Sequence, residues 1–389
     1  METEIRLLIL HIAFVLGGAE RTTRNLLEHL NRDEVSHITL AAPDILKRQL
    51  PTCYDSYVDT ADYGLQGSFQ GFKHLLEDAW RTKRLLNDVR ADVALGMMHY
   101  PSALITMGAR LGRKGTKTVA SFRGPFYEYL RHQEKKTRRK LFLWSAVTTT
   151  TLLADRIIVP SHGTGLELQR RFLGRNSNIV VIPNGIDQKQ AWRIAQQPPS
   201  DLAALQKMNV PLICAAARLA PEKDLNLLLA AFRQVVARKQ AHLILLGEGP
   251  EGPALEAIVK DWGIADAVSF LGFRRHIHPY LHQSSLFLHT CHFEGFGYTI
   301  LEAMACGTPV IATDCPYGPR EVLGDNQYGQ LVPPNDPQAM ADAVIRLLED
   351  DVKRRKLSEL GLVRARELSV QRMVQKYQTV FKELAVESS

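Results

Sequence analysis

The stretch LFLHTCHFEGFGYTILEAMACGTPVIATD, residues 286–314, decides the fold class. LFLHT and TPVIATD are short apolar runs typical of buried strands, and YTILEAMA between them has the character of a helix. The loop HFEGFG joins the first strand to this helix. A strand, a helix and a second strand in this order form a βαβ unit with parallel strands. The stretch therefore predicts an α/β fold.

The same alternation of strands and helices recurs along all 389 residues. The expected strands are IRLLIL, SHITLAA, ADVALGM, KTVASF, RIIVPS and NIVVIP in the first half, and PLICAAA, HLILL, VSFLG, LFLHT, TPVIAT and GQLVP in the second. The turn PNGID (183–187) and the proline-bearing AQQPPSD (195–201) separate the two series. We predict two Rossmann-like, doubly wound domains, residues 1–188 and 189–369. Ligands of such sheets bind beyond the carboxyl ends of the strands, so the cleft between the domains is the expected site.

The basic residues are concentrated in the first half of the chain. Residues 1–185 contain 26 Lys and Arg against 18 Asp and Glu, whereas the whole chain has 48 against 41. An excess of this kind favours an acidic partner: a nucleic acid, an anionic membrane or a phosphorylated substrate. The densest run, RHQEKKTRRK (131–140), is interpreted first as a solvated helix face. Nucleic acid is disfavoured because no recognised binding module accompanies the run.

Cysteine usage and the N-terminus bear on the compartment. The five cysteines are odd in number, widely spaced and without a CxxC pair, which favours reduced thiols in the cytoplasm. The segment METEIRLLIL has no basic stretch before a long apolar run, so neither a secretion signal nor a membrane span is expected. Peripheral attachment to the cytoplasmic face of an anionic membrane stays open.

Two loops that follow strands carry candidate phosphate ligands. Gly17 and Gly18 after the first strand let backbone approach an anion at a helix N-terminus, although a plain tight turn is an equal alternative. The spacing is not GxGxxG, which argues against a dinucleotide site. In RLAPEKD, Arg218 and Lys223 suit a diphosphate, and the alternative is a solvent-facing loop.

Two further loops add candidates for donor binding. Gly247 lies in a glycine-containing turn, GEGPEG, that is able to admit a base or a phosphate. Phe273, at the end of the next strand segment FLGF, is included with it. The candidate sites in residues 217–273 therefore all follow strands of the second domain.

The opening stretch places two glutamates eight positions apart. Gly297 leaves the following helix N-terminus uncluttered, so the N–H groups of Tyr298, Thr299 and Ile300 are expected to bind a phosphate. A buried carboxylate needs a partner, and sugar hydroxyls supply one. We expect Glu302 to bind a ribose and Glu294 to bind a second sugar beyond the diphosphate. The alternative, an exposed Glu302, is disfavoured because its helix is apolar almost all round.

These motifs together resemble one family. Glu294 and Glu302 with seven residues between them, GTPVIATD after them, Arg218 and Lys223 before them, and the N-terminal GGAER are similar to the retaining nucleotide-sugar glycosyltransferases of family 4, which have the GT-B fold. LADRIIVPS (153–161) and VIPNGID (181–187) extend the resemblance over nearly the whole chain.

The resemblance implies roles for the motif residues. Arg218 and Lys223 would hold the diphosphate of a UDP-sugar, helped by backbone at Gly17 and at 298–300, with no metal or other cofactor. Residues 370–389 would form a helix that packs back on the first domain. The element DCPYGPREVL (314–323) is similar to members that build bacterial surface polysaccharides and lipid-linked glycans, so a glycan or lipid-linked acceptor is expected.

One departure concerns the acceptor side. Many family members place a histidine after the strand that corresponds to KTVASF, but this chain has Phe122, Arg123 and Gly124 there. Arg123 and His99, which follows ADVALGM, are therefore named as candidates on the first, basic domain.

The remaining histidines do not predict a metal site. They lie in HIHPYLH and HTCH, no second ligand cluster completes a site, and they are interpreted as surface or cleft-lining residues: His276, His278, His282, His289 and His292.

No motif residue is an evident covalent nucleophile, so departure of the leaving group and attack on the same face of the sugar are expected. The rival hypotheses are a nucleotide-sugar epimerase of the same architecture and a non-catalytic nucleotide-sugar-binding protein.

Overall fold

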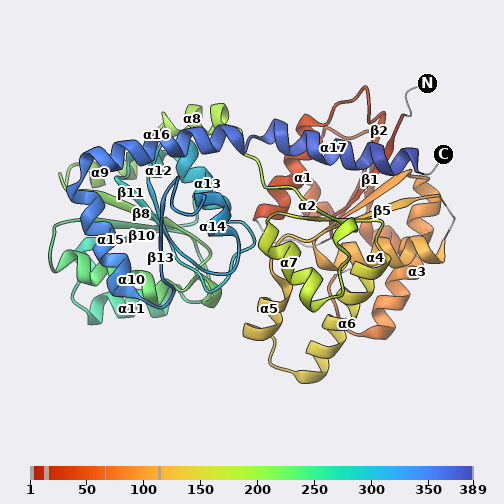
Figure 1. Ribbon diagram of the computed structural model, residues 1–389, viewed down its shortest axis with the longest axis horizontal. Coiled ribbons are helices and arrows are strands. Elements are labelled where there is room, and N and C mark those ends of the chain that lie inside the picture. Colours follow the sequence, from red (N-terminus) through yellow and green to blue (C-terminus); the bar gives the residue numbers. More distant parts are fainter. Residues whose placement is uncertain (1–3, 13–16, 66, 113–114, 388–389) are drawn as a thin grey trace. The chain divides into compact units, whose positions relative to one another are not determined.

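The computed structural model describes residues 4–12, 17–65, 67–112 and 115–387 (Figure 1). The chain divides into two compact units. Unit 1 comprises Met1–Asn184 with Val370–Ser389, and unit 2 comprises Gly185–Ser369. The division thus falls four residues before the position expected from the sequence. Each unit contains one parallel sheet with helices, so the predicted α/β class is confirmed.

Unit 1 has a seven-stranded sheet in the order β3-β2-β1-β4-β5-β6-β7. Its strands are β1 (Arg6–Leu10), β2 (His37–Ala42), β3 (Ser56–Asp59), β4 (Val93–Met97), β5 (Lys117–Ser121), β6 (Arg156–Val159) and β7 (Ile179–Val181). Six of these were expected, and β3 was not. β3 is a half-buried edge strand with the polar sequence SYVD, so it lacks the apolar run that marks the others.

The helices of unit 1 connect these strands. They are α1 (Gly18–His29), α2 (Asp44–Lys47), α3 (Phe72–Val89), α4 (His99–Leu111), α5 (Phe126–His132), α6 (Thr137–Leu153), α7 (His162–Arg171) and α17 (Val370–Val386), with short turns η1 (Thr60–Tyr63) and η2 (Asn176–Asn178). α17, at the C-terminus, lies beside α1 (Figure 1). Its Tyr377 and Phe381 are buried in one apolar cluster with Leu7 and Ile9 of β1. This packing makes α17 part of unit 1.

Unit 2 has a six-stranded sheet in the order β10-β9-β8-β11-β12-β13. The strands are β8 (Leu212–Ala216), β9 (His242–Leu246), β10 (Val268–Gly272), β11 (Leu286–His289), β12 (Val310–Thr313) and β13 (Gln330–Val332). All six were predicted from the sequence. β8, β9, β11 and β12 are buried along their whole length, because helices cover both faces of a parallel sheet.

The helices of unit 2 follow the same pattern. They are α8 (Gln188–Ala195), α9 (Ser200–Gln206), α10 (Leu225–Val236), α11 (Gly252–Asp261), α12 (His278–Gln283), α13 (Tyr298–Ala305), α14 (Gly318–Leu323), α15 (Pro337–Glu349) and α16 (Asp351–Glu367), with turns η3 (Pro221–Lys223) and η4 (Ala265–Ala267). Among the described helices of the chain, none combines the length and the apolar character that crossing a bilayer requires.

Each sheet has a point where the strand order changes direction. In unit 1 this point lies between β1 and β4, and in unit 2 between β8 and β11. The loops after these strands diverge there and leave space at the carboxyl edge, where open α/β sheets bind their ligands. In unit 2 the two loops carry Arg218 with Lys223 and Glu294 respectively. The fold therefore brings these distant residues to one edge.

Candidate active site

An ion pair joins the two loops at the switch point of unit 2. Lys223 Nζ donates to Glu294 Oε2 at 2.6 Å, and each side chain is about one-fifth exposed. Two more hydrogen bonds bind the same loops: Thr290 Oγ1 donates to the Lys223 carbonyl at 2.8 Å, and the His292 N–H donates to the Glu222 carbonyl at 2.9 Å. The loops after β8 and β11 thus form one structure around the pair.

The loop after β12 fixes the position of Glu294. The Glu294 N–H donates to the Pro316 carbonyl at 2.7 Å, and the Tyr317 N–H donates back to the Glu294 carbonyl at 2.9 Å. Gly318 packs so closely that a Cβ there would lie 2.3 Å from Phe296 Cα. The segment DCPYGPREVL therefore fixes the backbone that carries Glu294 through hydrogen bonds and close packing.

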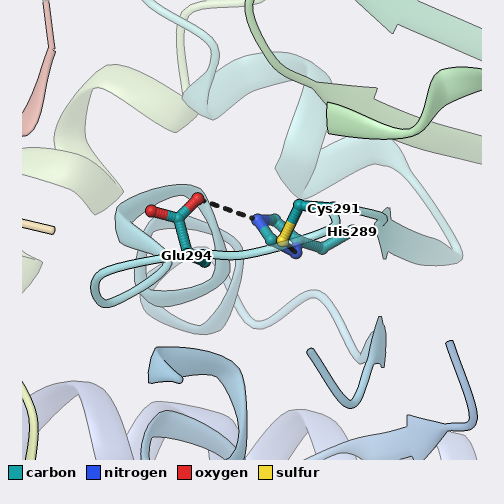
Figure 2. Close-up of side chains that lie close together, drawn as sticks. All are labelled: His289, Cys291 and Glu294. Carbon is teal, nitrogen blue, oxygen red and sulfur yellow. Dashed lines mark hydrogen bonds and ion pairs between the residues drawn. The ribbon is translucent and has the colours of Figure 1, made fainter. Parts of the chain in front are cut away.

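His289 and Cys291 lie next to Glu294 (Figure 2). His289 Nε2 is 3.6 Å from Glu294 Oε2, and His289 Nδ1 is 3.9 Å from Cys291 Sγ. His289 is 4% exposed, so it is not a surface residue. A sequence signal was available: His289 ends the fully buried strand β11, where an ordinary histidine would be costly without a partner.

Opposing effects set the protonation of this group. Burial by itself raises the pKa of Glu294, but Lys223 and then His289 outweigh it and hold that pKa well below its usual range. Burial likewise lowers the pKa of Lys223, but the Glu294 carboxylate more than compensates and the net shift is upward. Burial also opposes the charge on His289, but Cys291 and Glu294 raise the pKa of its imidazole to about 9. At neutral pH an ionised carboxylate therefore lies between two cations.

Arg218 lies beside the pair and reaches solvent. Its side chain is 56% exposed and its guanidinium donates to Glu222, which is nearly buried. Gly247, which follows β9, packs against the loop that carries Arg218. A Cβ at Gly247 would lie 1.8 Å from the Ala217 carbonyl oxygen, and its φ of +132° also favours glycine. Gly247 is thus needed for close backbone packing beside this loop.

Phe273 follows β10 at the same edge of the sheet. Its side chain is 53% exposed, and its N–H donates to Glu248 Oε1 at 3.1 Å. The exposed ring offers an apolar face to a planar group.

The first turn of α13 is only partly available as an anion site. Gly297 adopts a φ of +91°, and the Ile300 N–H donates to the Gly297 carbonyl at 3.0 Å. The Tyr298 hydroxyl donates to the Gly185 carbonyl at 2.7 Å and holds the start of the helix. The half-buried Thr299 lies between them at the positive end of the helix dipole. The Ile300 N–H, expected to bind phosphate, thus already has an acceptor.

Glu302 is completely buried in α13. His278 Nε2, at the start of α12, lies 3.5 Å from its Oε1. The alternative of an exposed helix residue is therefore wrong. His278 was interpreted from the sequence only as one of several surface or cleft-lining histidines, and its partner is 24 residues away on another helix.

In unit 1 the candidate residues Gly17 and Arg123 form hydrogen bonds within that unit. The Gly17 N–H donates to Glu20 Oε2 at 2.9 Å and Gly18 begins α1, so these glycines form a helix cap. The guanidinium of Arg123 donates to Thr22 Oγ1 at 2.7 Å, to the Tyr377 hydroxyl at 3.1 Å, and to the Asn184 side chain. Arg123 therefore joins the loop after β5 to α1 and α17, which is a structural task.

His99 begins α4 at the switch point of unit 1. Its ring centroid lies 4.3 Å from that of Phe126 and 4.9 Å from that of Phe122. Burial lowers its pKa to about 3, so the imidazole is neutral at physiological pH. The preceding Met98 has a φ of +74°, a strained value for a non-glycine residue that is often found at functional sites.

Comparison with known proteins covers both units. Residues 16–190 match the family profile Glycosyltransferase Family 4, and residues 201–362 match Glycosyl transferases group 1. The chain is 26% identical over 350 residues to the N-acetylgalactosamine-N,N'-diacetylbacillosaminyl-diphospho-undecaprenol 4-alpha-N-acetylgalactosaminyltransferase of Campylobacter jejuni. This match covers 90% of this chain and 92% of that protein. The chain is 36% identical to the N-acetyl-alpha-D-glucosaminyl L-malate synthase of Bacillus anthracis, over 39% of this chain and 40% of that protein.

Solved structures show the same fold. Anabaena HepE in complex with UDP-glucose superposes with a TM-score of 0.78 at 21% identity, covering 98% of this chain and 100% of that one. The sucrose-phosphate synthase of Thermosynechococcus elongatus gives a TM-score of 0.81 at 20% identity, covering 99% and 100%. The two profiles follow one another along the chain, the first mainly on unit 1 and the second on unit 2. The chain therefore belongs to the glycosyltransferases of family 4, with the GT-B fold.

Proposed function

We propose that the chain transfers a hexose or N-acetylhexosamine from a UDP-sugar to a hydroxyl of a glycan or lipid-linked glycan, with retention of anomeric configuration. The observation that carries the proposal is the Lys223–Glu294 pair, which lies at the switch point of a doubly wound sheet. The lipid-linked substrate named for the Campylobacter jejuni relative and the UDP-glucose complex of Anabaena HepE support the acceptor and donor classes.

The diphosphate binds Arg218, Lys223 and the first turn of α13. An ammonium group has three N–H donors, so Lys223 keeps its bond to Glu294 and still donates to a phosphate oxygen. Arg218 is exposed and exchanges its contact with Glu222 for a forked contact with the diphosphate. The Phe273 ring stacks on the nucleobase. These cations offset the charge that develops on the departing diphosphate.

Glu294 acts on the transferred sugar. Its Oε1 accepts the Gly295 N–H at 3.0 Å and its Oε2 accepts Lys223, which leaves acceptor capacity for sugar hydroxyls. Because Lys223 and His289 keep it ionised, Glu294 also stabilises positive charge on the sugar ring. The anomeric C–O bond to phosphate breaks, the acceptor oxygen bonds to the same carbon on the same face, and the acceptor proton passes to the departing phosphate oxygen.

A transfer assay tests this proposal against its rivals. The purified chain is incubated with UDP-glucose, UDP-N-acetylglucosamine or UDP-N-acetylgalactosamine and an undecaprenyl-diphosphate-linked glycan. We expect a product one sugar longer, with an α linkage from an α donor by NMR. Interconversion of the donor sugars without transfer would support an epimerase, and donor binding without turnover would support a binding protein.

Glu302→Gln should weaken UDP binding by about 1–3 kcal/mol, because a charged hydrogen bond to the ribose is lost. Isothermal titration calorimetry measures the change. The exposed Glu256 of α11 supplies the matched control, so Glu256→Gln should leave the affinity unchanged. Since Glu302 is buried, thermal denaturation of both variants is recorded as well. A loss of stability with unchanged UDP affinity would assign Glu302 to packing alone.

Transfer should not need a divalent metal ion, because Arg218 and Lys223 neutralise the diphosphate. The rate is measured after dialysis against EDTA, and then with Mg²⁺ or Mn²⁺ added back. We expect the same rate in each case. A complete loss that either ion restores would contradict the metal-free scheme.

Unit 1 presents a surface suited to the membrane that would hold a lipid-linked acceptor. The α3–α6 surface consists of Phe72, Leu76 and Trp80, which lie one helical turn apart on α3 and are each at least half exposed, together with Leu141 of α6, which is 67% exposed. The Phe72 ring packs on Phe142, the neighbour of Leu141, with 4.7 Å between the centroids. The apolar residues of the two helices therefore meet.

Basic residues border this surface at the start of α6. Lys135, Lys136, Arg138 and Arg139 are exposed around its first turn. Cations are unfavourable at the positive end of a helix dipole, so a bound anion is the natural compensation. Tryptophan, aliphatic residues and basic residues together are typical of proteins that lie in the interface of an anionic bilayer. We propose that this surface attaches the chain to such a membrane.

Replacing Lys135, Lys136 and Arg138 with glutamine should weaken binding to phosphatidylglycerol-containing vesicles about 100-fold at low salt, at about 1 kcal/mol per basic residue. Sedimentation of the chain with vesicles measures this. Equal charge removal on α16 of unit 2 is the control and should have no such effect: Lys353, Arg355 and Lys356. A vesicle affinity that is unchanged both by charge removal and by added salt would contradict the proposal.

A further inference from the structure

Four potential metal ligands gather beneath the ion pair of unit 2. His289 is the last residue of β11, Cys291 and Glu294 follow this strand, and Cys315 follows the neighbouring strand β12. Ligand atoms of the first three lie within 4.8 Å of one another (Figure 2), and the Sγ atoms of Cys291 and Cys315 are 3.1 Å apart. We call these four residues the Cys–His–Glu cluster. No second set of ligands for HTCH was expected from the sequence, but the pairing of β11 with β12 brings Cys315 next to Cys291.

The backbone holds the cluster in place. The Cys291 N–H donates to Thr313 Oγ1 of β12 at 3.1 Å, which fixes the two strand ends against each other. Cys315 precedes Pro316, whose carbonyl accepts the Glu294 N–H at 2.7 Å. The two thiols and the carboxylate are therefore positioned by one hydrogen-bonded network.

The ligand types select the class of ion. Thiolate, imidazole and carboxylate are the ligands of Zn²⁺ and similar thiophilic cations, whereas Mg²⁺ and Ca²⁺ require oxygen ligands. Bonds of roughly 2.0–2.3 Å in a tetrahedron put ligand atoms roughly 3.3–3.8 Å apart. The observed spacings lie on either side of this range: up to 4.8 Å among the ligand atoms of His289, Cys291 and Glu294, and 3.1 Å between the two Sγ atoms.

Access to the cluster lies on the side of Glu294. Cys291, Cys315 and His289 are each less than 5% exposed, whereas the side chains of Glu294 and Lys223 are 21% exposed. An ion that enters here meets Glu294 first and competes with Lys223 for its carboxylate. This competition makes the ion a reversible ligand rather than a permanent structural element, and it involves the carboxylate assigned to the donor sugar.

We propose that the Cys–His–Glu cluster binds one Zn²⁺ or similar thiophilic divalent cation, and that the bound ion inhibits sugar transfer by occupying Glu294. The first half stands on the geometry of the cluster alone. The second half rests on the proposed function, in which Glu294 contacts the sugar. Zinc and the donor sugar therefore compete.

Equilibrium dialysis of the reduced, metal-free chain against Zn²⁺, followed by elemental analysis, tests the site directly. We expect one tightly bound Zn²⁺ per chain, and no tightly bound Mg²⁺ in a parallel dialysis against Mg²⁺. Co²⁺ in place of Zn²⁺ should give the near-ultraviolet absorption of thiolate coordination. Cys291→Ser, which keeps the side-chain shape, should weaken Zn²⁺ binding at least 100-fold, and Cys315→Ser at least 10-fold. The exposed Cys53 supplies the control, and Cys53→Ser should bind as the unchanged chain does.

Thermal denaturation of each variant shows whether it is folded, and Co²⁺ spectra of the unchanged chain decide the ligand class without any substitution. Zn²⁺ bound equally well by Cys291→Ser, or lost in Cys53→Ser, would overturn the site. Zn²⁺ bound at the cluster without slower transfer would overturn the inhibition. If no UDP-sugar supports transfer at all, the proposed function fails while dialysis still decides the metal site.

Discussion

Glu294→Gln should lower kcat at least about 100-fold while changing UDP affinity by less than about threefold, because Glu294 stabilises charge that develops on the sugar only in the transition state. Glutamine keeps the shape and accepts from Lys223, but it carries no charge to offset that of the sugar ring. Steady-state kinetics with the donor and calorimetry with UDP give the two quantities.

Glu256→Gln on the exposed face of α11 is the matched control and should leave both quantities unchanged. Thermal denaturation separates a catalytic loss from misfolding. Turnover that survives in Glu294→Gln, or a loss of UDP affinity as large as the loss of kcat, would remove Glu294 from the role proposed here.

Lys223→Met should reduce kcat/KM by about 100- to 1,000-fold, because it removes a cation that binds the diphosphate and stabilises its departure. UDP affinity should fall as well, by about 1.5–3 kcal/mol, the range for a charged hydrogen bond. This combination differs from the selective loss of kcat in Glu294→Gln. Lys239, in the turn before β9 at the opposite edge of the same sheet, is the control. Lys239→Met should bind and transfer normally.

The same substitution should change the pH dependence. Lys223 lowers the pKa of Glu294 against the effect of burial, so its removal raises that pKa. A depressed carboxyl pKa contributes stability that is present above the ordinary value of about 4.3 and is lost as the pH falls through the native value. Transfer is proposed to require the ionised carboxylate of Glu294, so activity is lost as the pH falls through the pKa of this group. Because that pKa is higher in Lys223→Met, this variant should lose transfer activity at a higher pH than the unchanged chain. Identical acid limbs would show that Lys223 does not control Glu294.

Strand pattern alone predicted most of the fold. The twelve expected strands all exist, because each is an apolar run that repetition of βαβ units makes recognisable. β3 was missed because an edge strand exposes half its residues and tolerates polar ones. The two-unit division follows equally from the loop PNGID, since the chain leaves the first sheet there.

The candidate site was predictable only at the level of single loops. The spacing of Glu294 and Glu302 and the cations at the end of β8 identified the residues, but their contacts depend on distances that sequence does not encode. Lys223 and Glu294 are 71 residues apart, and Cys315 joins Cys291 only through the pairing of β11 with β12. The packing of Gly247 against Ala217 was likewise not evident from the sequence. The hydrogen bonds of Arg123 could not be foreseen either, since its partners lie on α1 and α17.

Lys223 and Glu294 are proposed to act together on one donor. A double-mutant cycle of kcat/KM with a UDP-sugar tests this most directly, using Lys223→Met, Glu294→Gln and the combined variant. Residues that act as a unit give strongly non-additive losses. We predict that the combined variant loses no more than about tenfold beyond the worse single variant. Losses that multiply fully, or single variants that transfer sugar at the unchanged rate, would contradict the assignment of this ion pair to the active site.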